Sequence, residues 1–169
     1  VVWNSGGYDR VETLAALEGK IQIYLPDYKY TDPDTARRYA GATDYPETAR
    51  AAIREMVRQT GPYQLDENGI LTRGVILRHL LLPGGLNQAK EVMDWVAETF
   101  PPHTILFSLM SQYTPWGKAA DSPPLDRRLR KSEIRAAEAY FTNLGLDGFT
   151  QGVEAAQAEY IPTFDLTGV

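Results

Sequence analysis

The chain has 169 residues, 43 % of them hydrophobic, which is enough apolar material for one domain with its own core. It contains no cysteine, which excludes disulfides, thiolate nucleophiles and cysteine-ligated clusters from these residues. With His79 and His103 as the only histidines, a two-histidine zinc site with local spacing is not expected. The net charge of −5 without a basic stripe argues against nucleic-acid binding. Without a long apolar run or a signal peptide, we expect a cytoplasmic protein that does not enter a membrane.

The predicted elements alternate between strands and helices. Short apolar runs predict strands at 1–3, 21–25, 74–82, 104–109 and 149–151, the third of them buried. Helical spacing predicts helices at 11–18, 33–39, 46–59, 87–100 and 132–143, the last with Ser132 as its N-cap. Segments 63–65 and 70–72 predict a hairpin with a tight turn at Asn68–Gly69. Residues 114–128 are expected to form a loop, and the tail 159–169 an ordered strap.

This alternation predicts parallel βα units, about five of them, which is too few for a closed eight-stranded barrel. The expected fold is therefore α/β, a partial parallel (β/α) barrel formed by residues 1–169 as a single domain. Its first strand has no earlier strand to pair with. Such an edge recruits other chains, so we expect self-association there or local disorder of the first residues, unless the tail covers the edge.

Polar residues follow the predicted strands, where parallel α/β folds place their functional sites. Asn4 and Ser5 begin an NSGG turn, whose glycines either let backbone amides approach a ligand or simply make a tight turn. Asp27 and Lys29 lie two positions apart and share a side of an extended chain. They could bind the two ends of a zwitterion, or form a salt bridge without further function.

Arg78 interrupts the apolar run GVILRHLLL, and a buried guanidinium needs an anionic partner. Asp27 or a ligand carboxylate would serve, and a purely structural pair with Asp27 is the alternative. His79 points the opposite way and is expected to be structural. Gln112 and Tyr113 follow the fourth strand and either contact a ligand or plug the barrel mouth.

Six segments in this order resemble the C-terminal part of pyruvate formate-lyase activating enzymes of the radical S-adenosylmethionine (SAM) superfamily: NSGGY, YLPDYKY, the alanine-rich helix 45–59, RHLLLPGG, SLMSQYTP and EYIPTFDLTGV. The resemblance implies a TIM-like partial barrel and a [4Fe-4S] cluster on a C-x3-C-x2-C motif in a preceding N-terminal part. The free iron of that cluster binds SAM, and reductive cleavage yields a radical that abstracts hydrogen from a glycine of a partner enzyme.

By the same resemblance, the residues that contact SAM are Asn4, Ser5, Asp27, Lys29, Arg78 and Tyr113. Asn4 replaces an aspartate of related activases, and Tyr113 stands where they have a histidine. The parent protein would then be an oxidoreductase with a glycyl-radical enzyme or another protein as partner, whereas this chain alone would bind no metal and be inactive. Two rivals stay open: a cluster-free barrel lyase that uses Lys29 as a Schiff base, and a non-catalytic binding module.

Overall fold

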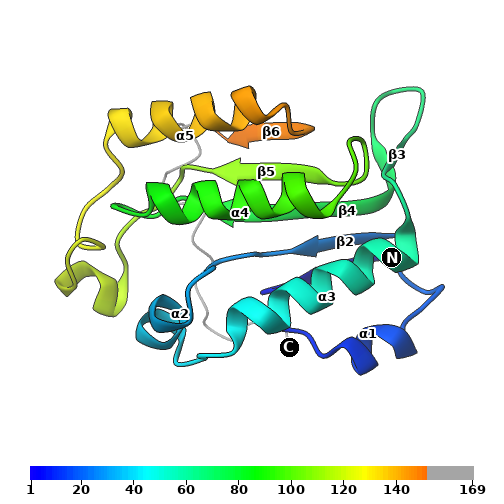
Figure 1. Ribbon diagram of the computed structural model, residues 1–169, viewed down its shortest axis with the longest axis horizontal. Helices are drawn as coiled ribbons and strands as arrows, with labels where there is room; N and C mark the ends of the chain where they lie inside the picture. The colour runs from blue at the N-terminus through cyan, green and yellow to red at the C-terminus, as the bar shows by residue number, and fades with distance from the viewer. Residues whose placement is uncertain (152–169) are drawn as a thin grey trace, which may run out of the picture.

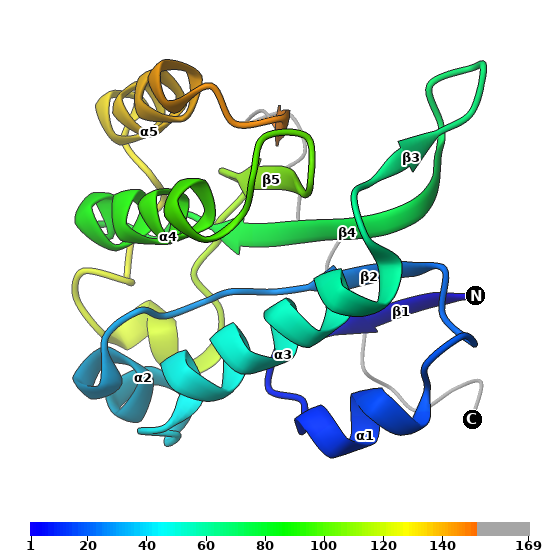
Figure 2. The ribbon, with the colours of Figure 1, turned by 45° about the vertical axis from the view of Figure 1, so that its right-hand side comes forward.

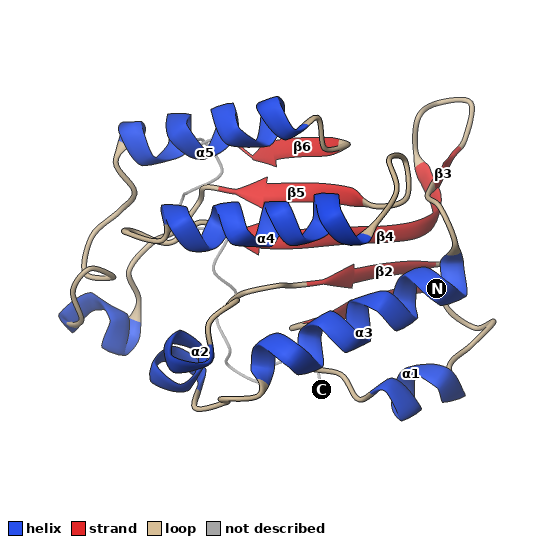
Figure 3. Cartoon of the chain, viewed as in Figure 1, coloured by secondary structure: helices blue, strands red, loops and turns tan. Residues whose placement is uncertain are grey.

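The computed structural model describes residues 1–151, and in it the predicted strands form one sheet (Figures 1 and 3). The parallel strands pair in the order β1 (Val2–Ser5), β2 (Ile23–Pro26), β4 (Leu71–Leu80), β5 (Leu106–Met110) and β6 (Gly148–Gln151). A short strand, β3 (Gln64–Leu65), pairs antiparallel with β4. Within the described residues, β1 is at one end of this order, as predicted. The predicted strap lies outside the described residues.

The helices lie on one side of the sheet. They are α1 (Val11–Ala16), α2 (Pro33–Ala40), α3 (Tyr45–Thr60), α4 (Leu86–Thr99) and α5 (Lys131–Leu144), and a short 3-10 helix, η1 (Gly117–Asp121), precedes α5. Because the strand order follows the chain order, right-handed crossovers bring successive helices to the same face. Figures 1 and 2 show α3, α4 and α5 on this face. The predicted fold class, a partial parallel α/β barrel, is confirmed.

The two faces of the sheet differ in burial. The face toward the helices carries Tyr24, Val75, Leu77 and Phe107, which are completely buried. The opposite face, here called the inner face, carries half-buried side chains: Leu25, Ile76, Arg78 and Leu80. The predicted buried strand at 74–82 is thus buried on one face and half-buried on the other, because the described helices cover only one side of it.

The hairpin between β3 and β4 has a longer turn than predicted. Asp66 N donates to Ile70 O at 2.9 Å and Gly69 N to Asp66 O at 3.0 Å, which encloses three residues rather than two. Asp66 Oδ1 also accepts from Ile70 N at 2.8 Å. This side-chain bond stabilises the wider turn, which the Asn-Gly pair alone does not predict.

The start of α5 also differs from the prediction. The helix begins at Lys131, so Ser132 lies inside its first turn and is not the N-cap. Glu133 Oε2 instead accepts from Arg130 N at 2.7 Å, and Glu133 Oε1 accepts from Gly84 N at 2.8 Å. Glu133 thus ties the start of α5 to the loop that follows β4.

Among residues 1–151, no helix has the length and apolarity that a bilayer crossing requires.

Candidate functional site

Three neighbouring strands bring Asn4, Asp27 and Arg78 together at the carboxyl edge of the sheet. Asp27 and Arg78 pair as a parallel bridge, and Asn4 pairs with Leu25, so the three side chains share the inner face. Arg78 Nη2 donates to Asn4 Oδ1 at 2.7 Å and lies 2.7 Å from Asp27 Oδ1. The predicted pairing of Arg78 with Asp27 is confirmed, although the Arg78 side chain is 26 % exposed rather than buried.

This cluster, which we call the Asp27–Arg78 cluster, is completed by Lys29 and is loosely bonded. Lys29 Nζ lies 3.9 Å from Asp27 Oδ2, and 48 % of its side chain is exposed. The buried Arg78 Nε has no hydrogen-bond partner in the part of the chain that the structure describes. The exposed Lys29 ammonium is therefore a donor that a ligand with an anionic group could use.

A second arginine, Arg58, shows what a saturated cluster looks like in the same molecule. Its guanidinium donates to both carboxylate oxygens of Glu18 at 2.9–3.0 Å and to both of Glu55 at 2.8 Å. The Arg58 hydrogen bonds, followed by one from Gln59, lower the pKa of Glu55 to about 2. Arg58 joins α3 to the residues after α1, which is a structural role.

A tyrosine hydroxyl holds the cluster in place. Tyr45 Oη accepts from Lys29 N at 2.9 Å and lies 2.9 Å from Gly6 O and 3.0 Å from Asp27 O, one of which receives its proton. Burial raises the pKa of Tyr45, which keeps that proton in place. Gly7 sits in the same junction at φ 77°, and a Cβ there would lie 2.1 Å from Asp27 O. The turns after β1 and β2 are thus locked to each other.

Ser5 does not reach the cluster. Its Oγ donates to Asp9 Oδ2 at 2.5 Å and accepts from Gly7 N at 3.2 Å, which stabilises its own turn. A role for Ser5 toward a cofactor stays a prediction.

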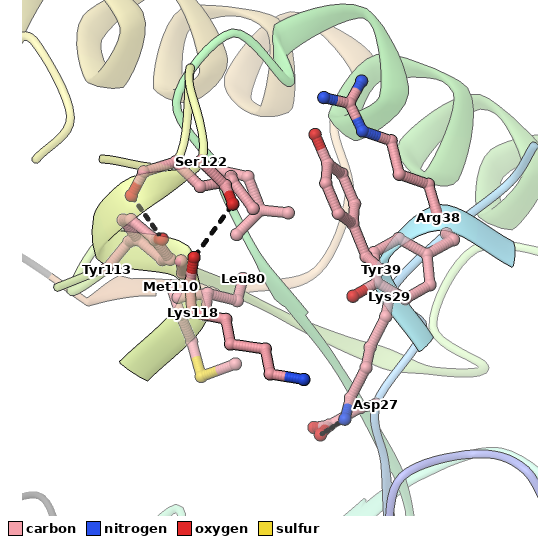
Figure 4. Close-up of a pocket in the computed structure, with 13 residues that line it drawn as sticks. Asp27, Lys29, Arg38, Tyr39, Leu80, Met110, Tyr113, Lys118 and Ser122 are labelled. Atoms are coloured by element: carbon pink, nitrogen blue, oxygen red, sulfur yellow. Dashed lines mark hydrogen bonds and ion pairs between the residues drawn. The ribbon is translucent and has the colours of Figure 1, made fainter. Parts of the chain in front are cut away.

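An open cavity of about 720 Å³ lies at the carboxyl ends of β2, β4 and β5 (Figure 4). Asp27 and Lys29 line one wall and Tyr113 the other, whereas Asn4 and Arg78 lie outside the lining. A non-catalytic module would be expected to have its strand ends closed by side chains, and the open cavity does not match that expectation. Tyr113 contributes its ring, because its hydroxyl donates to Leu125 O at 2.7 Å.

Further lining residues were not predicted from the sequence. Arg38 and Tyr39 come from the end of α2, and Lys118 comes from η1. Arg38 lies over the Tyr39 ring, 5.4 Å from its centroid. The sequence around Arg38 and Tyr39 predicts only a short helix, and the sequence around Lys118 predicts only a loop. Neither pattern indicates a functional site.

His79 is structural, as predicted. It is 1 % exposed, and its Nδ1 lies 2.7 Å from Tyr28 O, to which it donates. Burial lowers the pKa of His79 to about 4, so the ring is neutral near pH 7. Among residues 1–151 there is no group of three His, Asp or Glu side chains that could hold a metal ion.

Known proteins resemble this chain in sequence and in fold. No protein family model matches the sequence. An uncharacterized protein of Methanocaldococcus jannaschii is 28 % identical over 148 residues, which cover 87 % of this chain but only 39 % of that protein.

Two solved structures share the fold. A domain of pyruvate-formate lyase-activating enzyme from Bacteroides vulgatus superposes with a TM-score of 0.61 at 15 % identity, over 88 % of this chain and 79 % of that one. A radical SAM methyltransferase from Sphaerobacter thermophilus gives 0.57 at 16 % identity, over 90 % of this chain and 41 % of the other. The chain therefore shares the fold of these two structures, a partial parallel α/β barrel.

Proposed function

We propose that this chain forms part of the SAM-binding site of a radical SAM enzyme of the glycyl-radical-enzyme activase type. The observation that carries the proposal is the Asp27–Arg78 cluster beside an open cavity at the carboxyl ends of the strands. The fold shared with two radical SAM enzyme domains supports it.

The residues present fit the polar groups of SAM. The methionine end of SAM carries a carboxylate and an ammonium group, which need donors and an acceptor close together. In the lining of the cavity Lys29 offers a donor and Asp27 an acceptor, and Arg78 pairs with Asp27 at 2.7 Å. The rings of Tyr39 and Tyr113 line the same cavity and suit the face of an adenine. A cavity of about 720 Å³ is in the range that holds ligands of this size.

The residues present do not fit an iron–sulfur cluster. The chain has no cysteine, and its described residues offer no metal-binding group. In this proposal the cluster is held by residues outside this chain. Beside such a cluster, bound SAM supplies a carbon radical. The residues of this chain bind and orient SAM, and the walls of the cavity limit the access of water.

The lyase alternative is less well supported. A Schiff-base lysine must be a neutral amine, which enzymes obtain by burying the side chain, and nearly half of Lys29 is exposed. Borohydride reduction with a carbonyl substrate that labels Lys29 would favour the lyase over the proposal made here.

Calorimetric titration of the purified chain with SAM tests the proposal. Asp27→Asn and Arg78→Gln should each weaken SAM binding by about tenfold or more, since each removes a charged hydrogen-bonding partner. The controls are Asp34→Asn and Arg37→Gln, which break an exposed 2.8 Å ion pair on α2 and should leave the affinity unchanged. The proposal would be refuted if the folded wild-type chain did not bind SAM, or if the control variants lost as much SAM affinity as the site variants.

Anaerobic reconstitution with iron and sulfide tests the second half of the proposal. The chain should stay colourless and form no 5′-deoxyadenosine from SAM and dithionite, because no thiolate is present to hold a cluster. A brown product with charge-transfer absorption would show that other side chains bind iron, and the assignment of the cluster to a different part of the enzyme would fail.

A further inference from the structure

The charge of the cavity does not match SAM alone. Its lining includes three cationic side chains, Lys29, Arg38 and Lys118, and one carboxylate, Asp27. Asp27 is already paired with Arg78 at 2.7 Å. SAM adds another net positive charge, because its sulfonium and ammonium groups outnumber its carboxylate. A cavity with this surplus of positive charge favours a second, negatively charged ligand.

Arg38 and Lys118 are the cations left for that ligand. Neither forms an ion pair with any residue in the described part of the chain. The acidic residues close to Arg38 are engaged elsewhere: Asp32 accepts from Thr35 N at 2.7 Å, and Asp34 pairs with Arg37. Both cations are thus available to a ligand.

The two cations come from opposite walls of the cavity. Figure 4 shows Arg38 and Tyr39 on the α2 side, and Lys118 with Tyr113 on the other side of the gap. Guanidinium and ammonium groups bind carboxylates and phosphates. A ligand with an anionic group suits this arrangement.

We propose that the molecule on which the enzyme acts carries an anionic group, a carboxylate or a phosphate, recognised by Arg38 and Lys118. This inference rests on the proposed function, which places SAM at the Asp27–Arg78 cluster. It assigns Arg38 and Lys118 to the second ligand and leaves Lys29 to SAM. The overall negative charge of the chain, −5, makes the positive cavity the favoured place for such an anion to bind.

Titrations of the chain with three small probes, followed by amide chemical shifts, test the inference. Phenyl phosphate and benzoate carry the two anionic groups on the same ring, and benzylamine is the cationic counterpart. Both anions should change the chemical shifts of amides near Arg38 and Lys118 in a saturable way. Whichever anion binds more tightly shows whether the site prefers a phosphate or a carboxylate. Benzylamine should not bind there. Saturable binding of benzylamine with equal affinity, or of neither anion, would overturn the inference.

Charge-removing variants link the binding to the two residues. Arg38→Gln and Lys118→Gln should each weaken the tighter anion by about fivefold, the effect expected for a partly exposed charged contact. The matched controls are Arg37→Gln, the neighbour of Arg38 on α2, and Lys20→Gln, an exposed lysine before β2; both lie outside the lining and should change nothing. Unchanged anion binding in the Arg38 and Lys118 variants would contradict the assignment.

SAM titrations of the same variants separate this inference from the proposed function. If SAM binds the wild type and the Arg38 and Lys118 variants equally, both proposals stand. If the variants lose SAM affinity by tenfold, the two cations belong to the SAM site and only the inference fails. If SAM does not bind at all but the anions do, the proposed function fails and the anion site remains.

Discussion

Two adjacent residues of β4, Arg78 and His79, face opposite sides of the sheet and have opposite surroundings. His79 is enclosed under the helices, neutral, with its ring proton donated to a backbone carbonyl. Arg78 is on the inner face, charged and partly exposed, with one nitrogen left without a partner among residues 1–151. One position along a strand thus separates a saturated structural group from an unsaturated one.

The difference shows where function is to be sought in this molecule. On the helix-covered face, the buried His79 has its ring donor satisfied by Tyr28 O. Side chains at the carboxyl edge of the inner face leave donors and a cavity open, which costs stability and is retained where a ligand completes the bonding.

The largest expected effect comes from Gly7→Ala, which disrupts the junction beside the Asp27–Arg78 cluster. The new Cβ would lie 2.1 Å from Asp27 O at a backbone φ of 77°. Strain and overlap together should destabilise the fold by about 4 kcal/mol in urea unfolding. Gly19→Ala is the matched control, because Gly19 has a φ of 79° but a Cβ there would meet no atom within 4 Å, and it should cost only about 1 kcal/mol. Equal losses would mean that contact with Asp27 is unimportant.

Acid should lower the stability of the fold through His79, on the helix-covered face. The histidine pKa falls from about 6.5 in the unfolded chain to about 4 in the fold, so the unfolded state binds more protons between these values. The stability contributed by His79 is complete above pH 6.5 and declines as the pH falls, by about 3 kcal/mol in total at pH 4.

Urea unfolding at a series of pH values measures this decline. Carboxylates titrate in the same range, so His79→Gln is the reference, and the difference between the two proteins isolates the histidine. A wild type and His79→Gln with parallel pH profiles would show that burial of His79 has no such effect.

Tyr45→Phe should lower both the stability and the SAM affinity, to a smaller degree, because Tyr45 is the buried residue that fixes the Asp27–Arg78 cluster. Loss of the hydroxyl leaves the Lys29 amide without its partner and should cost about 2 kcal/mol of stability. SAM affinity should fall as well, since Asp27 and Lys29 lose their common anchor. Tyr8→Phe is the control: Tyr8 stacks on Tyr45, but its hydroxyl bonds the exposed Asp44. If Tyr8→Phe and Tyr45→Phe weaken SAM binding alike, the hydroxyl is not the anchor.

The smallest effect concerns the edge of the inner face at β1. Val2 lies on the same face as Asn4 and is 54 % exposed. We expect weak self-association through β1, seen as a rise in sedimentation coefficient with concentration, and its loss in Val2→Lys. Sedimentation that does not change with concentration would rule out this association.

The sequence by itself determined the order of the elements, the parallel sheet and the separate roles of Arg78 and His79. These features depend on local periodicity and on one strong constraint, that a charge in an apolar strand needs a partner. For that partner the sequence left Asp27 and a ligand carboxylate open, and the register of the sheet placed Asp27 beside Arg78.

Only the tertiary structure decided the rest of the site. Tyr45 meets Gly6 from 39 positions away, and Arg78 meets Asn4 from 74 positions away. Arg38 and Lys118 come to one cavity from a helix end and a loop. Sequence patterns report the side on which a residue lies within its own element, over three or four neighbours. Which distant elements converge depends on how the helices pack and how the sheet curves, and that packing is a property of the whole chain.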